Sequence, residues 1–232
     1  MWSRKALHLT LQGVQSLGAK LGNLGWKPVS HSKGHDLLKA AWVARHIEPG
    51  ARVLDIGGGN GRRLMDLSLY VQDLDGTAIE IQKVNPPTPA LPSMVVPKVS
   101  VFDGKQIPFD DDAFDVSMIC YVLHHLKDAH ARDLLIEACR VTSKRLILLE
   151  DSRPQFSLPY HVRNWAHATE ANLEYAARSS HFVQNFRHTM FKTHSQWIDL
   201  LESLDAVERV ECVPLDSISK YRHHTMFVAH LK

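Results

Sequence analysis

The chain has few cysteines, no long apolar run and no large excess of one charge. Its three cysteines, Cys120, Cys139 and Cys212, stand far apart without CxxC or disulfide-framework spacing, which suits a reducing, cytoplasmic setting. No apolar run approaches the roughly 20 residues that cross a bilayer, so we expect no membrane span. The formal net charge is +2 with interspersed signs, which gives no reason to expect nucleic acid as a partner and favours a small molecule.

Compact metal-ligand spacings are also absent. The 15 histidines include no HExxH pattern, and adjacent histidines such as those at 124 and 125 would point apart on a strand or crowd on a helix. We therefore expect scattered surface and core histidines and no metal site.

Residues 1–35 contain no acidic side chain, whereas five lysines and arginines occur there. Apolar residues recur at helical spacing: Leu7, Leu11, Val14, Leu17, Leu21 and Leu24. We interpret this segment as an N-terminal amphipathic arm, and three roles stay open. It could cover the domain's own ligand cleft as a lid, or act as an organelle transit segment or a membrane-surface helix formed by residues 1–25, or bind a partner.

The remaining chain, residues 36–232, has the length of one α/β domain. Apolar, β-branched runs predict strands at 52–56, 77–81, 98–102, 114–121, 145–150, 207–213 and 225–230. Helical patterns lie between them at 36–46, 61–70 and 129–141, Asp75-Gly76 reads as a turn, and five prolines make 85–97 a loop. This alternation predicts a mostly parallel sheet of seven strands with helices on both faces.

Residues 151–192 depart from the alternation, because this stretch is rich in aromatic residues and histidine. We expect it to be an insertion that covers the substrate. A helix is predicted to follow at once, since Thr193 and Gln196 fit a capping box. One helical face would carry Trp197, Leu200, Leu201 and Leu204.

The clearest chemical signal is the run from Val53 to Gly61, in which a buried strand enters a glycine turn and then a helix. Glycines let the backbone approach a ligand closely, and open α/β sheets bind ligands beyond the carboxyl ends of their strands. A dinucleotide fingerprint GxGxxG would require glycine where Arg62 stands, and the Gly-Lys-Ser/Thr of a P-loop is missing. Ligands held through a pyrophosphate are therefore disfavoured.

This run resembles motif I of class I S-adenosylmethionine (SAM)-dependent methyltransferases of the type 11 kind, and it matches every position of that motif. The resemblance implies a Rossmann-like fold with SAM as cofactor and S-adenosylhomocysteine as product. It also implies that the cofactor lies along Asp55, Gly57, Gly58, Gly59 and Asn60.

The resemblance continues over residues 36–150. It implies that Glu80, ending the second strand, accepts hydrogen bonds from both ribose hydroxyls, which a carboxylate can do, with Ile81 beside it. Asp103 follows the third strand, where the family reads the adenine amino group, and Gly104 comes next. The segments 108–115 and 121–126 resemble the family's links into and out of the fourth strand, which would lay Cys120 and Tyr121 along the cofactor.

Methyl transfer from SAM is an in-line displacement by an oxygen, nitrogen or sulfur nucleophile, and positioning the acceptor supplies much of the catalysis. A base is needed only for acceptors that are protonated at the working pH. His124, at the end of the fourth strand, is the candidate catalytic residue, and a capping or packing role is its alternative.

The acceptor site should be built from the N-terminal arm and the segment after residue 150. The candidate substrate-binding residues are Asp151, Arg153, Tyr160, Trp165, Arg187, His188 and Tyr221. Their aromatic character favours a small, partly apolar acceptor. Two other functions stay open: a SAM-binding subunit without chemistry that binds or regulates a partner, and aminopropyl transfer on the same fold. The acceptor, the atom methylated and the oligomeric state stay open as well.

Overall fold

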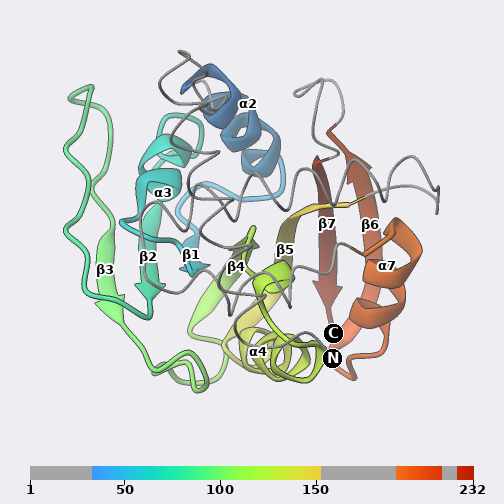
Figure 1. The fold of residues 1–232 in the computed structure, drawn as a ribbon. Coiled ribbons are helices and arrows are strands. Elements are labelled where there is room, and N and C mark those ends of the chain that lie inside the picture. The colour runs from blue at the N-terminus through green and yellow to red at the C-terminus, as the bar shows by residue number, and fades with distance from the viewer. Residues whose placement is uncertain (1–32, 153–191, 216–223) are drawn as a thin grey trace, which may run out of the picture. The chain divides into compact units, whose positions relative to one another are not determined.

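The computed structural model describes residues 33–152, 192–215 and 224–232. Within them lies a seven-stranded sheet of order β3-β2-β1-β4-β5-β7-β6 (Figure 1). The strands are β1 (Arg52–Ile56), β2 (Asp75–Glu80), β3 (Lys98–Val101), β4 (Phe114–Cys120), β5 (Thr142–Asp151), β6 (Val207–Pro214) and β7 (His224–Leu231). Strands β1 to β5 pair in parallel, and β7 runs antiparallel to both β5 and β6. This confirms the predicted seven-stranded, mostly parallel sheet.

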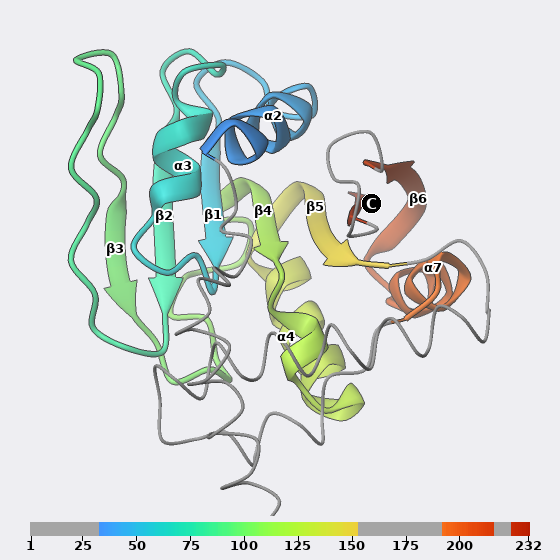
Figure 2. The ribbon, with the colours of Figure 1, turned by 45° about the horizontal axis from the view of Figure 1, so that its top comes forward.

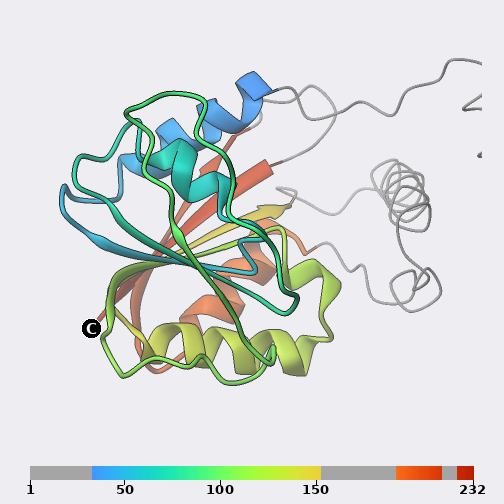
Figure 3. The ribbon, with the colours of Figure 1, turned by 90° about the vertical axis from the view of Figure 1, so that its left-hand side faces the viewer.

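Helices cover both faces of this sheet. On one face lie α2 (Lys33–Ala44) and α3 (Arg62–Leu67), and on the other α4 (Asp128–Arg140) and α7 (His194–Glu202), as Figure 3 shows with the sheet nearly on edge. Val53 packs with α2 and α3, whereas its neighbour Leu54 packs with α4 and α7, and both are fully buried. Covering both faces therefore explains why the central strand β1 is buried continuously from Val53 to Ile56, without alternation. None of the described helices has the length and apolarity to cross a membrane.

One predicted turn is wrong. Asp75 and Gly76 begin β2, where they pair with the first two residues of β1. The chain turns earlier, and Asp73 has a positive φ of 53°. A Cβ at Gly76 would stand 3.4 Å from Leu64 of α3, at ordinary van der Waals contact, so α3 packs directly over this part of β2.

The order of the strands creates a switch point between β1 and β4. From β1 the chain builds β2 and β3 on one side, and then crosses to place β4 and β5 on the other. The arrowheads of β1 to β4 point to one edge of the sheet (Figure 2). At a switch point the loops that leave two neighbouring strands diverge, so a ligand can reach between them.

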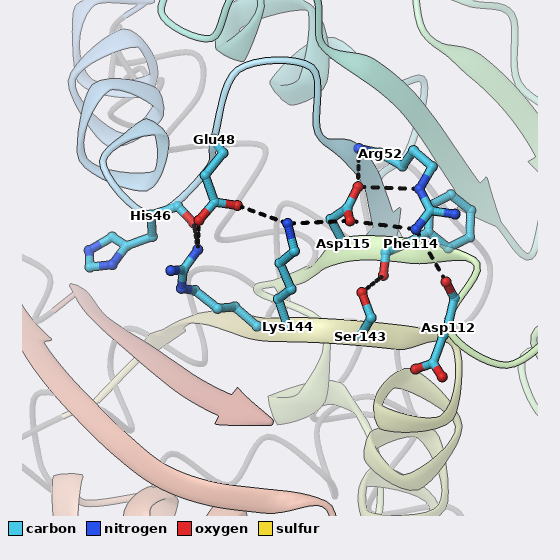
Figure 4. Close-up of polar contacts among 9 residues, drawn as sticks. His46, Glu48, Arg52, Asp112, Phe114, Asp115, Ser143 and Lys144 are labelled. Atoms are coloured by element: carbon cyan, nitrogen blue, oxygen red, sulfur yellow. Dashed lines mark hydrogen bonds and ion pairs between the residues drawn. The ribbon is translucent and has the colours of Figure 1, made fainter. Parts of the chain in front are cut away.

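At the opposite, amino edge of the sheet, ionic groups join the strand starts to the loop before β1 (Figure 4). Arg52 donates to Asp115 from its backbone nitrogen at 2.9 Å and from Nε at 3.2 Å. Lys144 Nζ lies 3.4 Å from Glu48 and 3.6 Å from Asp115, and Arg145 donates to Glu48 at 2.8 Å. This amino-edge network links β1, β4 and β5.

Candidate functional site

The glycine loop leaves β1 at the carboxyl edge and bends over the end of β2. The backbone N–H groups of Gly57 and Gly58 both donate to the Ile79 carbonyl, at 2.8 and 3.2 Å. Gly57 has a φ of 68°, and a Cβ there would stand 2.6 Å from Val122 Cγ2. Gly59 has a φ of 57°, yet a Cβ there would meet no protein atom within 4 Å. The loop is therefore packed at Gly57 and borders open space at Gly59.

Asp55 supports this loop from beneath. Its carboxylate is fully buried and lies 3.3 and 3.4 Å from Nη1 of Arg63. Burial raises the pKa of Asp55, and the Arg63 charge opposes that rise. A Cβ at Gly58 would come within 2.7 Å of Asp55 Oδ2, so the loop rests directly on the carboxylate. Asn60 accepts a hydrogen bond from the Arg62 backbone at 3.2 Å, where α3 begins.

Glu80 ends β2 beside the open space at Gly59. Its Oε2 accepts from the Gly59 N–H at 3.1 Å and its Oε1 from the Ile81 N–H at 2.8 Å. Each carboxylate oxygen has a second lone pair, so a partly exposed Glu80 can accept further hydrogen bonds. The Ile81 side chain is 59% exposed although it is apolar. A hydrogen-bond acceptor, Glu80, and an exposed apolar side chain, Ile81, therefore lie next to each other.

Asp103 and Gly104 lie after β3, next to Ile81. The backbone N–H groups of Lys105 and Gln106 donate to Asp103 Oδ1 at 2.8 and 2.9 Å, and these hydrogen bonds lower the pKa of Asp103. A Cβ on Gly104 would stand 3.2 Å from Ile81 Cγ2. Residues following β1, β2 and β3 are thus brought to one edge.

The end of β4 combines burial with backbone strain. Burial raises the pKa of the Cys120 thiol to about 12. Tyr121 has a φ of 61°, and its hydroxyl is buried with no hydrogen-bond partner among the described residues. Its ring lies 5.2 Å from the His224 ring and 4.9 Å from Lys39 Nζ. Burial, followed by the Asp151 charge, raises the pKa of the Tyr121 hydroxyl well above 10, so this hydroxyl keeps its proton.

His124 lies in the short helix η1 (Leu123–His125), directly after β4. Its Nδ1 is 2.6 Å from Oε2 of Glu150, which is fully buried near the end of β5. The Leu123 N–H donates to the other oxygen of Glu150 at 2.9 Å. His124 is a residue predicted from the sequence, whereas Glu150 is not.

Among the candidate acceptor residues, the structure describes Asp151, whose Oδ1 lies 3.0 Å from Nδ1 of His224 across β5 and β7. The other candidates lie outside the described residues: Arg153, Tyr160, Trp165, Arg187, His188 and Tyr221. Most of the predicted arm, residues 1–32, and most of the predicted insertion lie outside them too. In the part of the chain that is described, no group of three or more histidine, cysteine or acidic side chains could hold a metal ion.

Four polar residues at this edge were missed: Lys39, Arg63, Glu150 and His224. Glu150 had a visible signal, since it is an acid directly after the apolar run 146–149. Arg63 could have been found as a base in the first turn after the glycine loop. Lys39 and His224 had no local signal, because their contacts with Tyr121 depend on how α2 and β7 pack.

Parts of this chain are similar in sequence to known proteins. Residues 54–148 match the family model described as a methyltransferase domain. The uncharacterized methyltransferase YcgJ of Bacillus subtilis (strain 168) is 32% identical over 108 residues, which are 45% of this chain and 42% of that relative. The match to this curated relative thus spans less than half of either protein.

Solved structures share the fold at low identity. The crystal structure of Bacillus subtilis YcgJ has a TM-score of 0.54 at 16% identity and covers 86% of this chain and 98% of that one. CalO1, a methyltransferase in calicheamicin biosynthesis solved with S-adenosylhomocysteine bound, has a TM-score of 0.59 at 18% identity and covers 84% of this chain and 54% of its own. A putative Haloferax volcanii methyltransferase, solved with the activator Trm112, has a TM-score of 0.58 at 14% identity and covers 94% and 97%.

Proposed function

We propose that this protein is a cytoplasmic SAM-dependent methyltransferase, because residues 54–148 match the family model described as a methyltransferase domain. It would transfer a methyl group from SAM to an oxygen, nitrogen or sulfur atom of a small acceptor molecule and leave S-adenosylhomocysteine. The observation that carries the proposal is the hydrogen bond between Gly59 and Glu80 at the carboxyl edge of the sheet. Open space borders the backbone of Gly59, and the carboxylate of Glu80 stands beside it. The formal net charge of +2 gives no support to a nucleic acid acceptor.

The residues at the carboxyl edge fit such a cofactor. Glu80 would accept from the ribose hydroxyls with its remaining lone pairs. Ile81 offers an exposed apolar surface for a flat base, and Asp103 next to it would accept from the adenine amino group. The loop from Gly57 to Asn60, resting on Asp55, would pass beneath the cofactor, with Cys120 and Tyr121 along its other side.

The cofactor supplies an electrophilic methyl group, and the chain supplies position and a proton acceptor. His124 would take the proton of the acceptor where one must be lost. Asp151, which follows Glu150 at the end of β5, would contribute to the acceptor site. The other candidates, Arg153, Tyr160, Trp165, Arg187, His188 and Tyr221, stay proposed substrate-binding residues.

A pair of alanine substitutions tests the cofactor assignment. Gly59→Ala adds a methyl group in the space where the cofactor is proposed to bind. Gly50→Ala adds the same group at the opposite edge of the sheet, away from that space. Both glycines have a positive φ, of 57° and 74°, and both have open space at the Cβ position. Each variant should therefore lose a similar stability, about 1 kcal/mol. Only Gly59→Ala should lose affinity.

The measurement is calorimetric titration with SAM and with S-adenosylhomocysteine. We expect micromolar binding to the unaltered protein and to Gly50→Ala. Binding to Gly59→Ala should be at least about tenfold weaker, because the added methyl group occupies the proposed cofactor space. Binding to Glu80→Ala should weaken at least as much, because one lost charge-assisted hydrogen bond is worth about 1.5–3 kcal/mol. Equal weakening by the two glycine variants would refute the site. Binding without turnover of any oxygen, nitrogen or sulfur acceptor would favour the alternative of a non-catalytic SAM-binding subunit.

A further inference from the structure

Glu150 is a fully buried carboxylate near the end of β5, preceded by four buried apolar residues, Leu146 to Leu149. A buried charge is costly unless hydrogen bonds satisfy it. Here both oxygens are engaged: Oε1 accepts from the Leu123 N–H at 2.9 Å, and Oε2 lies 2.6 Å from Nδ1 of His124. Both partners belong to η1, which follows the neighbouring strand β4.

This contact determines the chemistry of the His124 ring. An ionised carboxylate can only accept hydrogen bonds, so Nδ1 of the neutral imidazole must carry the proton. The lone pair is then on Nε2, which is the basic nitrogen. The Leu123 hydrogen bond holds the carboxylate in place from a second direction, which fixes the ring orientation as well as the tautomer.

The pair also lies at the proposed site. Val122, two residues before His124, packs against the glycine loop at Gly57. Strands β4 and β5 are adjacent, and Cys120 at the end of β4 pairs with Leu149, the residue just before Glu150. The buried pair therefore stands at the carboxyl edge, on the β4 side of the switch point.

We infer that Glu150 is a positioning residue, which holds His124 with its proton on Nδ1 so that Nε2 accepts the proton of an acceptor hydroxyl during methyl transfer. This inference rests on the proposed function and narrows its acceptor class. The hydroxyl oxygen forms a bond to the methyl carbon while the carbon–sulfur bond breaks and sulfur keeps the electron pair. The hydroxyl proton passes to Nε2 and later to solvent.

A hydroxyl is the acceptor that needs this arrangement most. A thiol ionises near pH 8.5 and is a good nucleophile as the thiolate. A neutral amine attacks with its own lone pair and can release its proton to water afterwards. A hydroxyl oxygen is a poor nucleophile until a base begins to remove its proton. A buried carboxylate that is hydrogen-bonded to the imidazole therefore favours oxygen methylation.

Glu150→Gln tests the inference by changing one atom. The glutamine oxygen can still accept from Leu123, but its NH₂ group would then donate to Nδ1 of His124 and move the ring proton to Nε2. NMR of the ring nitrogens, with His124→Gln to assign the signal, reports the tautomer without cofactor or activity. We expect the Nδ1-protonated form in the unaltered protein and the Nε2-protonated form in Glu150→Gln. The same tautomer in both would overturn the inference.

Activity supplies the second readout. With a hydroxyl acceptor, Glu150→Gln should lower kcat roughly 10²–10⁴-fold, the usual contribution of a general base, and leave KM nearly unchanged. Glu150→Asp, which keeps an accept-only carboxylate, should retain the tautomer and more of the kcat, and it serves if the glutamine variant does not fold. Glu211→Gln is the matched control, because Glu211 pairs with His230 at 2.8 Å on β6 and β7, away from η1.

The outcomes separate two failures. If the protein does not bind SAM, the proposed function falls, while the NMR comparison still reports on the histidine pair. If SAM binds and hydroxyl acceptors are methylated, but Glu150→Gln keeps the full kcat, the positioning role is refuted and Glu150 is structural only.

Discussion

At the scale of single residues, Tyr121 combines two costs at the end of β4. A non-glycine residue at a φ of 61° is strained by roughly 1–3 kcal/mol. Its hydroxyl is buried without a hydrogen-bond partner among the described residues, a further cost of about 1–3 kcal/mol. Neither cost helps the chain to fold. Costs of this kind persist where a ligand repays them, which favours a role for Tyr121 in binding.

Replacing Tyr121 with phenylalanine separates folding from binding. Because the hydroxyl has no described partner, Tyr121→Phe should leave the free energy of unfolding unchanged or raise it by up to about 1 kcal/mol. Affinity for SAM or for the acceptor should fall. Urea unfolding and calorimetric titration measure the two effects, with Tyr70→Phe as the control, since Tyr70 is 48% exposed. A clear loss of stability in Tyr121→Phe would show that the hydroxyl is bonded within the protein.

At the scale of elements, α7 depends on the cap at its amino end. The Thr193 hydroxyl accepts from the Gln196 N–H at 3.2 Å, and the Gln196 side chain accepts from the Thr193 N–H at 2.8 Å, which confirms the predicted capping box. The helix then buries Trp197 and Leu201 against the sheet. The cap therefore fixes where this apolar face begins.

Thr193→Ala removes one half of the capping box. We expect a loss of about 1 kcal/mol in the free energy of unfolding, the usual cost of a missing N-cap. Thr193→Ser keeps the hydroxyl and should cost only a few tenths of a kcal/mol. Urea denaturation of both variants makes the comparison. Equal stability of the alanine and serine variants would mean that the cap adds nothing and that Trp197 packing alone holds α7.

Local patterns predicted the elements whose signals are local. The strand at 52–56 was placed correctly because an apolar run ends in glycines, and the capping box because its two residues are three apart. Asp75-Gly76 failed because pairing with β1 outweighs the turn preference of that dipeptide. The glycine loop could be singled out from one local motif, and Glu80 from its place at the end of the second strand. Glu150 could not be paired with His124, 26 residues away, because that contact requires knowing that β4 and β5 are neighbours.

Across the described part of the molecule, the two edges of the sheet differ in how their charges are satisfied. At the amino edge, Arg52, Asp115 and Lys144 form ion pairs that are partly open to water. At the carboxyl edge, Asp55 and Glu150 are fully buried. Exposed pairs contribute little each and are screened by salt. Substitutions at the amino edge therefore do not alter the proposed site. A variant there should change stability while SAM binding stays the same, and unchanged binding serves as the control.

Asp115 gives the amino-edge network a defined pH dependence. Partial burial raises the pKa of Asp115, but hydrogen bonds and charge from Arg52, with charge from Lys144, outweigh it and hold the pKa below its ordinary 3.8. A carboxyl whose pKa is lower in the folded state stabilises the fold above the unfolded value, and this stabilisation disappears as the pH falls through the folded value. Asp115→Asn should therefore lower the Tm by a few degrees at pH 7, about 1 kcal/mol for such a pair.

The difference in Tm between the two proteins should shrink as the pH falls below about 4, because Asp115 then becomes protonated and both proteins carry a neutral group at this position. Circular dichroism melting curves at pH 7, 5, 4, 3 and 2 follow the trend. Asp75→Asn is the control, since its pair with Lys98 is largely exposed and should shift the Tm by about 1 °C or less. A constant difference for Asp115→Asn down to pH 2 would show that the asparagine acts through packing, and that the charge of Asp115 contributes nothing to the sheet.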